Sequence, residues 1–250
     1  MTSAITFSLL GPVRAWRDGV ELPLGDARQR TVLAVLLLRE GARTSTSELA
    51  EAIGDQFQVP AYVHRLRRTL SGGPVQLVWF GGGYALHVPS ESVDARRLTT
   101  HLARADGAGA EAAAAELEAA VALRRGVPLE GVTGTFAAEQ RERLDEMCRT
   151  AATRLPAVLL ESGRYEEAIA GLRALVAERP LHEPGHALLL TALHRAGRRA
   201  EALAHYRTVR YTLATQLGVE PAPELRKLNR MILDVDYPTV SAVQRGLPPT

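Results

Sequence analysis

The sequence predicts an α+β N-terminal part of about ninety residues followed by an all-α part. Three observations support this division. Short stretches that alternate apolar and polar side chains occupy both ends of the first part, which is typical of β-strands. Between them, apolar residues recur at helical spacing. From about Asp94 onward the strand pattern is absent, alanine and leucine dominate, and charged residues recur at helical spacing.

Three short strands are predicted at the N-terminus. Residues 5–9, 13–15 and 20–24 each alternate apolar side chains with polar or small ones. Gly11-Pro12 interrupts the first pair, and Asp18-Gly19 is a tight hairpin signal between the second and third. We therefore expect a small antiparallel sheet.

Two helices are predicted after this sheet. Asp26 can cap a helix that runs to about residue 40, and Gly41 ends it. Ser45 followed by Glu48 matches a capping box, in which each side chain accepts a hydrogen bond from the other residue's backbone N–H. This box opens a second helix over residues 47–53.

The run from Tyr62 to Leu70 predicts a third helix with two different faces. At about 100° per residue, the apolar side chains share one face and can be buried. The opposite face collects a small residue, an imidazole and guanidinium groups. The first face carries Val63, Leu66 and Leu70, and the second carries Ala61, His64, Arg65 and Arg68, with Arg67 at the flank. Such a helix can lie in the DNA major groove and meet base edges and phosphates, although a solvated surface helix shows the same pattern.

A glycine-linked hairpin follows. Residues 75–80 and 84–88 are rich in strand-forming side chains, and Gly81–Gly83 joins them. Strands, three helices and a terminal hairpin, in this order, are the parts of a winged helix-turn-helix, which is the predicted fold of the first part. In that fold the third helix enters the major groove, and the hairpin, called the wing, touches the neighbouring DNA backbone.

The second part is predicted to be an all-α, tetratricopeptide-like helical repeat domain. Helices are expected on both sides of a loop at residues 126–134. Leu159–Ile169 then aligns with Leu193–Leu203, and the turn glycines Gly163 and Gly197 are 34 positions apart. A period of this length, with glycine in the turn and a small residue at the helix crossing, is the signature of this repeat.

Arginine and histidine side chains of the third helix are the candidate DNA contacts. Arg65 and Arg68 are expected to reach the groove or the phosphates, with His64 beside them. Base-specific contact and backbone contact are equally open for Arg65. Arg67 is expected on a phosphate.

Residues outside that helix complete the candidate site. Arg28 and Arg30, near the start of the first helix, can reach phosphates or can simply be solvated there. Tyr84 is included as a ring that anchors the wing rather than as a direct contact. For Trp79 and Phe80 we expect burial against the helices rather than stacking on bases.

Composition excludes several other classes of protein. The chain has 250 residues, is 46% hydrophobic and carries a net charge of only +2. If it binds a polyanion, the positive charges that do so must therefore be concentrated on one part of its surface. The single cysteine, Cys148, permits no internal disulfide or cysteine-based metal site and favours a reducing cytoplasm. Neither a membrane span nor a secretion signal is expected.

No catalytic, cofactor or metal site is predicted. His182 and His186 are four residues apart, but Pro184 lies between them and no third ligand is evident. Gly81–Gly83 is not followed by the lysine and helix of a phosphate loop. Because a nucleophile elbow and paired carboxylates are also absent, we do not expect an enzyme.

As a set, these motifs resemble the Streptomyces antibiotic regulatory protein family, and in particular its small members, which join an OmpR-like winged helix to a bacterial transcriptional activation domain. The matching stretches are Gly11-Pro12, Ala27–Arg30, Tyr62–Leu70, Gly83–Leu86, Val93-Asp94, Arg124–Leu129 and Leu217–Pro221. We accordingly expect a DNA-binding domain over residues 1–92, a helical activation domain over 93–236 and a flexible C-terminal tail over 237–250.

By resemblance, such proteins are transcriptional activators of secondary-metabolite gene clusters, for example for antibiotic biosynthesis. Two copies are expected side by side, as a homodimer on direct repeats in double-stranded promoter DNA, where they recruit RNA polymerase through its sigma factor and α subunit. Residues 54–60 are several positions too few for the loop and first helical turn that the family has before Val63. This shortening supports an alternative, a protein-interaction co-regulator with weakened DNA recognition.

Overall fold

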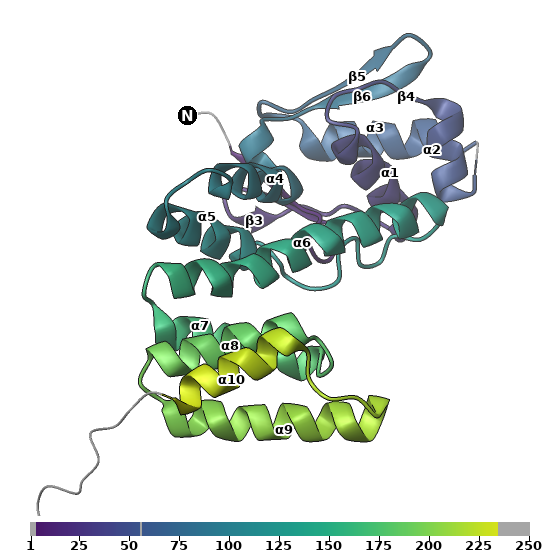
Figure 1. Cartoon of the computed structure of the whole chain (residues 1–250). Coiled ribbons are helices and arrows are strands. Elements are labelled where there is room, and N and C mark those ends of the chain that lie inside the picture. The colour runs from purple at the N-terminus through teal and green to yellow at the C-terminus, as the bar shows by residue number, and fades with distance from the viewer. Residues whose placement is uncertain (1–3, 56, 235–250) are drawn as a thin grey trace, which may run out of the picture. The chain divides into compact units, whose positions relative to one another are not determined.

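The computed structural model describes residues 4–55 and 57–234 and divides into two compact units. The first unit is Met1–Arg154 and the second is Leu155–Thr250 (Figure 1). The tail predicted at residues 237–250 lies outside the described residues.

The first unit opens with the predicted antiparallel sheet. Its strands are β1 (Ile5–Ser8), β2 (Arg14–Arg17) and β3 (Val20–Glu21), in that order across the sheet. Strand β3 is shorter than the predicted 20–24 run. Pro23 explains this because proline has no N–H to donate to a neighbouring strand.

Helix α1 (Ala27–Leu38) is largely buried. The carboxylate of Asp26 accepts a hydrogen bond of 2.9 Å from the backbone N–H of Gln29, which is the predicted cap. Every residue over positions 31–37 is buried. A helical segment that is apolar on all sides, as residues 32–37 are, is expected to be buried.

Helix α2 (Thr46–Ile53) begins at the predicted capping box. The hydroxyl of Ser45 accepts from the Glu48 backbone N–H at 3.2 Å, and the Glu48 carboxylate accepts from the Ser45 backbone N–H at 2.8 Å. The helix ends at Gly54, which adopts the left-handed conformation at φ 67°.

Helix α3 (Val59–Leu70) begins three residues before the predicted run at Tyr62. Pro60 lies in its first turn, where the missing N–H costs nothing. The predicted apolar face of Val63, Leu66 and Leu70 is buried, and Val59 and Tyr62 are buried as well. The segment between α2 and α3 is therefore short, whereas α3 itself has 12 residues.

The wing is the hairpin of β5 (Gln76–Phe80) and β6 (Gly83–His87), as predicted. A third strand, β4 (Thr44–Ser45), pairs with β6 and was not predicted. Gly83 permits this pairing, because a Cβ atom at that position would clash with the carbonyl oxygen of Thr44. With helices α1 to α3, the wing completes a winged helix-turn-helix.

The remainder of the first unit is helical. It comprises α4 (Asp94–Ala105), α5 (Ala110–Ala122) and most of α6 (Thr135–Glu161), with a short 3-10 turn, η1 (Ser90–Ser92), before α4. The buried carboxylate of Asp94 joins this region to the segment directly after β1, since it accepts hydrogen bonds from the backbone N–H groups of Leu9 and Leu10 at 2.7 and 3.1 Å. Burial raises the pKa of Asp94, and these hydrogen bonds oppose that shift.

The second unit contains the predicted repeats. Its helices after α6 are α7 (Tyr165–Glu178), α8 (Glu183–Arg195), α9 (Arg199–Leu217) and α10 (Pro223–Leu233) (Figure 1). Gly163 and Gly197 occupy equivalent turns at φ 80° and 75°. Ala168 and Ala202 are both fully buried, as expected where helices cross closely. The second unit is thus tetratricopeptide-like. Among the described residues no helix combines the length and apolar character that a membrane crossing needs.

Candidate DNA-binding site

The exposed face of α3 carries cationic side chains. His64, Arg65 and Arg68 are all exposed, whereas Val63 and Leu66 on the other face are buried. Helix α3 contains no carboxylate. Within the part of the chain that the structure describes, neither Arg65 nor Arg68 forms an ion pair. Their charges are therefore available to an anionic partner.

Arg65 is held by a ring of its own helix. The guanidinium carbon of Arg65 lies 5.2 Å from the centroid of the Tyr62 ring, a cation–π contact. Tyr62 is itself buried, so its ring is a fixed platform. This contact restricts the rotamers of Arg65 before any partner binds.

Arg67 connects α3 to the wing. Its Nε donates a hydrogen bond of 3.0 Å to the backbone carbonyl of Leu77 in β5. The C-terminal end of α3 is also fixed by Arg17 of β2, whose Nη2 donates to the carbonyls of Thr69 and Ser71 at 3.0 and 2.6 Å. These are carbonyls that a helix end leaves without an intrahelical partner. Side chains thus join the last turn of α3 to the wing and to the N-terminal sheet.

The two arginines of α1 are less available than those of α3. Arg28 lies 3.5 Å from the carboxylate of Asp55, which partly neutralises it. Arg30 is half-buried, and its Nε is buried without a hydrogen-bond partner among the described residues. The phosphate contacts predicted for both residues stay predictions.

The wing aromatics differ from expectation in one respect. Tyr84 is buried, and its ring meets Trp79 edge to face with centroids 4.8 Å apart. The prediction that Trp79 and Phe80 are buried against the helices is wrong, because they are 57% and 67% exposed. They lie at the end of the edge strand β5, where the hairpin extends beyond the helices (Figure 1).

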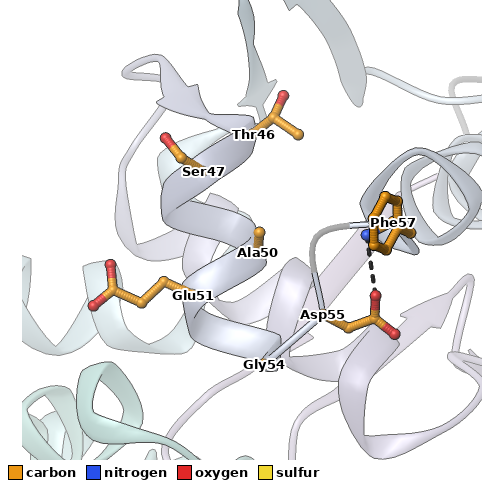
Figure 2. A pocket seen from close by; sticks show the side chains of 7 residues that line it. All are labelled: Thr46, Ser47, Ala50, Glu51, Gly54, Asp55 and Phe57. Atoms are coloured by element: carbon orange, nitrogen blue, oxygen red, sulfur yellow. Dashed lines mark hydrogen bonds between the residues drawn. The ribbon is translucent and has the colours of Figure 1, made fainter.

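A hollow of about 920 Å³ beside α2 was not foreseen. Figure 2 shows the short α2–α3 segment facing this helix, with the carboxylate of Asp55 accepting a 3.0 Å hydrogen bond from the backbone N–H of Phe57. The ring of Phe57 is 83% exposed. The hollow is lined by Thr46, Ser47, Ala50, Glu51, Gly54, Asp55 and Phe57. Two carboxylates make this surface unsuitable for phosphate.

In the second unit His186 pairs with His205, which lies on a different helix. The Nδ1 of His186 lies 3.0 Å from the Nε2 of His205, and the Nε2 of His186 lies 3.0 Å from the carbonyl oxygen of Pro180. The Nδ1 of His182 accepts from the backbone N–H of Gly185 at 3.2 Å. In the described ranges no three metal-ligating side chains gather.

Comparison with known proteins gives the family. The model of the bacterial transcriptional activator domain matches residues 93–233. Regulatory protein DnrI of Streptomyces peucetius is 30% identical over 250 residues, which is 92% of this chain and 92% of that protein. The chain belongs to the Streptomyces antibiotic regulatory protein family.

Other members of this family are longer. Regulatory protein AfsR of Streptomyces coelicolor is 41% identical over 248 residues, which cover 94% of this chain but only 25% of AfsR. A solved structure of Mycobacterium tuberculosis EmbR in complex with a low-affinity phosphopeptide superposes with a TM-score of 0.79 at 32% identity. That match covers 92% of this chain and 65% of the EmbR chain. AfsR is named as a regulatory protein and EmbR as a transcriptional regulatory protein. The family assignment agrees with the prediction that the chain is not an enzyme.

Proposed function

We propose that this chain is a sequence-specific DNA-binding transcriptional activator of a secondary-metabolite gene cluster, such as an antibiotic cluster. The observation that carries the proposal is the exposed, carboxylate-free cationic face of α3, with Arg65 and Arg68 outside any ion pair among the described residues. Arginine binds phosphates and guanine edges through its planar fork of donors. Membership of a family of transcriptional regulators supports the same function.

We propose a separate role for each part of the chain. Residues 1–92 bind DNA, and residues 93–236 contact RNA polymerase through its sigma factor and α subunit. His64, Arg65, Arg67 and Arg68 lie at the groove, Arg28 and Arg30 lie near phosphates, and Tyr84 anchors the wing. Two copies occupy direct repeats side by side.

A gel-shift titration tests this function. The full chain is titrated against the promoters next to its own gene and against shuffled duplexes of equal length and composition, at about 150 mM salt. We expect at least about a thousandfold tighter binding to one promoter, the lower end for specific recognition. Equal binding to all duplexes would remove the sequence-specific claim.

The direct-repeat claim has its own measurement. Inserting about half a helical turn, roughly 5 base pairs, between the repeats rotates one copy to the opposite side of the duplex. Cooperative binding of the second copy should then be lost, and inserting a full turn should restore it. Binding that does not respond to spacing would contradict the side-by-side arrangement.

A second candidate function, a protein-interaction co-regulator, is favoured by the short α2–α3 segment and its exposed Phe57. On this account the chain alone binds promoter DNA no better than shuffled DNA, but it alters binding by a full-length relative. The same titration with and without such a relative separates the two functions.

A further inference from the structure

A second hollow, of about 290 Å³, lies beside the N-terminal sheet in the first unit. Residues of β1 and β2, the start of α4 and the segment directly after α5 line it. Its volume is at the lower end of small-molecule sites, which span about 300–1,000 Å³. The hollow therefore suits a ligand of one or two rings rather than a nucleotide or a peptide.

The sheet contributes an indole and two hydroxyl groups to this hollow. Thr6 and Ser8 lie on either side of Phe7 in β1, so they share one face of the sheet. Trp16 is the residue opposite Thr6 in the register of β1 and β2, which places its ring on that same face. One face of a short hairpin thus presents a flat apolar ring next to hydrogen-bonding groups.

Two arginines on the other side of the hollow bring positive charge. Arg97 of α4 and Arg125 after α5 are both exposed, and neither forms an ion pair or a side-chain hydrogen bond within the part of the chain that the structure describes. The guanidinium carbon of Arg125 lies 5.5 Å from the centroid of the Trp16 ring, a contact that holds it beside the indole. A guanidinium fork binds a carboxylate through two parallel hydrogen bonds.

Asp94 is the one carboxylate among the lining residues, and its oxygens are already engaged. Besides Leu9 and Leu10, the backbone N–H of Ala95 donates to it at 2.8 Å. Two guanidinium groups against one carboxylate leave the hollow with a net positive charge, which favours an anion.

A buried hydroxyl in the same hollow is open to a ligand. Ser8 is only 3% exposed, and its hydroxyl makes no hydrogen bond of good geometry to any described residue. It lies near enough to Asp94 to oppose the rise in the pKa of that carboxyl that burial causes. Because buried polar groups in proteins are nearly always hydrogen-bonded, an oxygen of a ligand would supply the missing partner.

The walls of the hollow are fixed before any ligand arrives. The backbone N–H of Arg125 donates to the carbonyl of Leu10 at 2.8 Å, and that of Leu129 donates to the carbonyl of Leu9 at 2.9 Å. Phe7 and Val93 form a parallel bridge on another side. Segments far apart in the sequence therefore hold one another, and a preformed site of this kind loses little conformational entropy on binding.

We propose that this hollow binds a small aromatic carboxylate. The ring of the ligand lies against the indole of Trp16, its carboxylate accepts from Arg97 and Arg125, and one of its oxygens accepts from the hydroxyl of Ser8. A free phosphate would leave the indole uncovered. The proposal does not rest on the proposed DNA-binding function, because no residue of α3 or of the wing lines the hollow.

Calorimetric titration of the full chain with 1-naphthoate, without DNA, tests the proposal. We expect one site per chain with a Kd of about 1 mM or tighter, the range for a ligand of this size. The uncharged 1-naphthamide has nearly the same shape and should bind at least about tenfold more weakly. Inorganic phosphate at the same concentration should not bind. Equal affinity for the acid and the amide, or for the acid and phosphate, would overturn the proposal.

Substitutions locate the carboxylate. Arg97→Gln and Arg125→Gln should each weaken naphthoate binding about tenfold, since each removes charged hydrogen bonds. Arg104→Gln is the matched control, because it removes one arginine from an exposed position on the same helix that does not line the hollow. Thermal melts without ligand check that all three variants are folded. Unchanged affinity in both of the first two variants, or an equal loss in the control, would refute the site.

The two indoles give an independent readout in solution. The chain has two tryptophans, so Trp79→Phe assigns the two indole N–H signals in a nitrogen-15 NMR spectrum. During titration with naphthoate the Trp16 signal should move with the Kd found by calorimetry, and the Trp79 signal should stay in place. Binding heat without movement of the Trp16 signal would place the ligand elsewhere and refute the proposal.

Discussion

The guanidinium of Arg65 is stacked over the ring of Tyr62, with 5.2 Å between the guanidinium carbon and the ring centroid. Tyr62 faces the core of the winged helix, whereas Arg65 faces outward. The ring of Tyr62 thus sets the direction of the Arg65 side chain. An arginine ordered in this way loses less side-chain entropy when it binds its target.

Replacing Tyr62 tests this relationship. Tyr62→Phe keeps the aromatic face and should leave DNA affinity nearly unchanged. Tyr62→Leu removes it and should weaken binding by a few-fold, since an exposed cation–π contact contributes about 0.5–1 kcal/mol. Titrations by fluorescence anisotropy measure both, with thermal melts to confirm folding. Equal affinity of the two variants would show that the ring does not position Arg65.

The short strand β4 gives a second prediction. In Gly83→Ala the new methyl group would clash with the carbonyl of Thr44, so the pairing of β4 with β6 should break. We expect a loss of stability of about 1–3 kcal/mol and weaker DNA binding through a displaced wing. Chemical denaturation measures the first effect.

A suitable control for that substitution is Gly109→Ala. At Gly109 no atom lies within 4 Å of an added Cβ, and its φ of −65° suits any residue. If Gly83→Ala were as stable as this control, the close approach of β4 would have no energetic importance.

The histidine pair predicts a pH dependence of the second unit. A carbonyl oxygen only accepts, so His186 donates to Pro180 from Nε2 and accepts at Nδ1 from the Nε2–H of His205. Burial, with contributions from His186 and Arg173, lowers the pKa of His205 to about 4. Burial also lowers the pKa of His186.

Because these pKa values lie below that of an unfolded histidine, the unfolded chain binds more protons as pH falls through about 6.5. The contribution of these neutral histidines to the free energy of unfolding should therefore be fully present at pH 7 and should decline toward pH 4. Allowing for partial exposure of the rings, we expect a loss on the order of 1 kcal/mol by pH 5. In His205→Gln, which keeps a donor and removes one titrating group, the decline should be smaller. Melting curves at several pH values decide this, and an equal decline in both proteins would contradict it.

Local signals in the sequence predicted much of this fold. The Ser45 and Glu48 box, the Asp26 cap and the repeat of Gly163 at Gly197 each depend on residues close together in the chain or at a fixed period. Such features need no knowledge of distant contacts. The apolar face of α3 followed from helical spacing for the same reason.

Features that depend on distant contacts could not be predicted. Strand β4 has two residues, too few to show any alternation. The alternation in β5 could not reveal that its end extends beyond the helices and leaves Trp79 and Phe80 exposed. In the sequence Arg67 is simply an exposed cation of the helix. Only the structure shows that the carbonyl oxygen of Leu77 lies 3.0 Å from its Nε. The early start of α3 could have been predicted from Pro60, because proline is common in the first turn of a helix.

The salt dependence of promoter binding by an Arg65→Ala, Arg68→Ala double variant tests the central claim most directly. Each phosphate contact that is lost should reduce the slope of log K against log salt by about 0.9, so we expect a reduction of up to about 1.8 together with weaker binding. Arg195→Ala, which removes one positive charge from an exposed position on α8, should leave the slope unchanged. An unaltered slope and affinity in the double variant would show that the cationic face of α3 does not bind DNA.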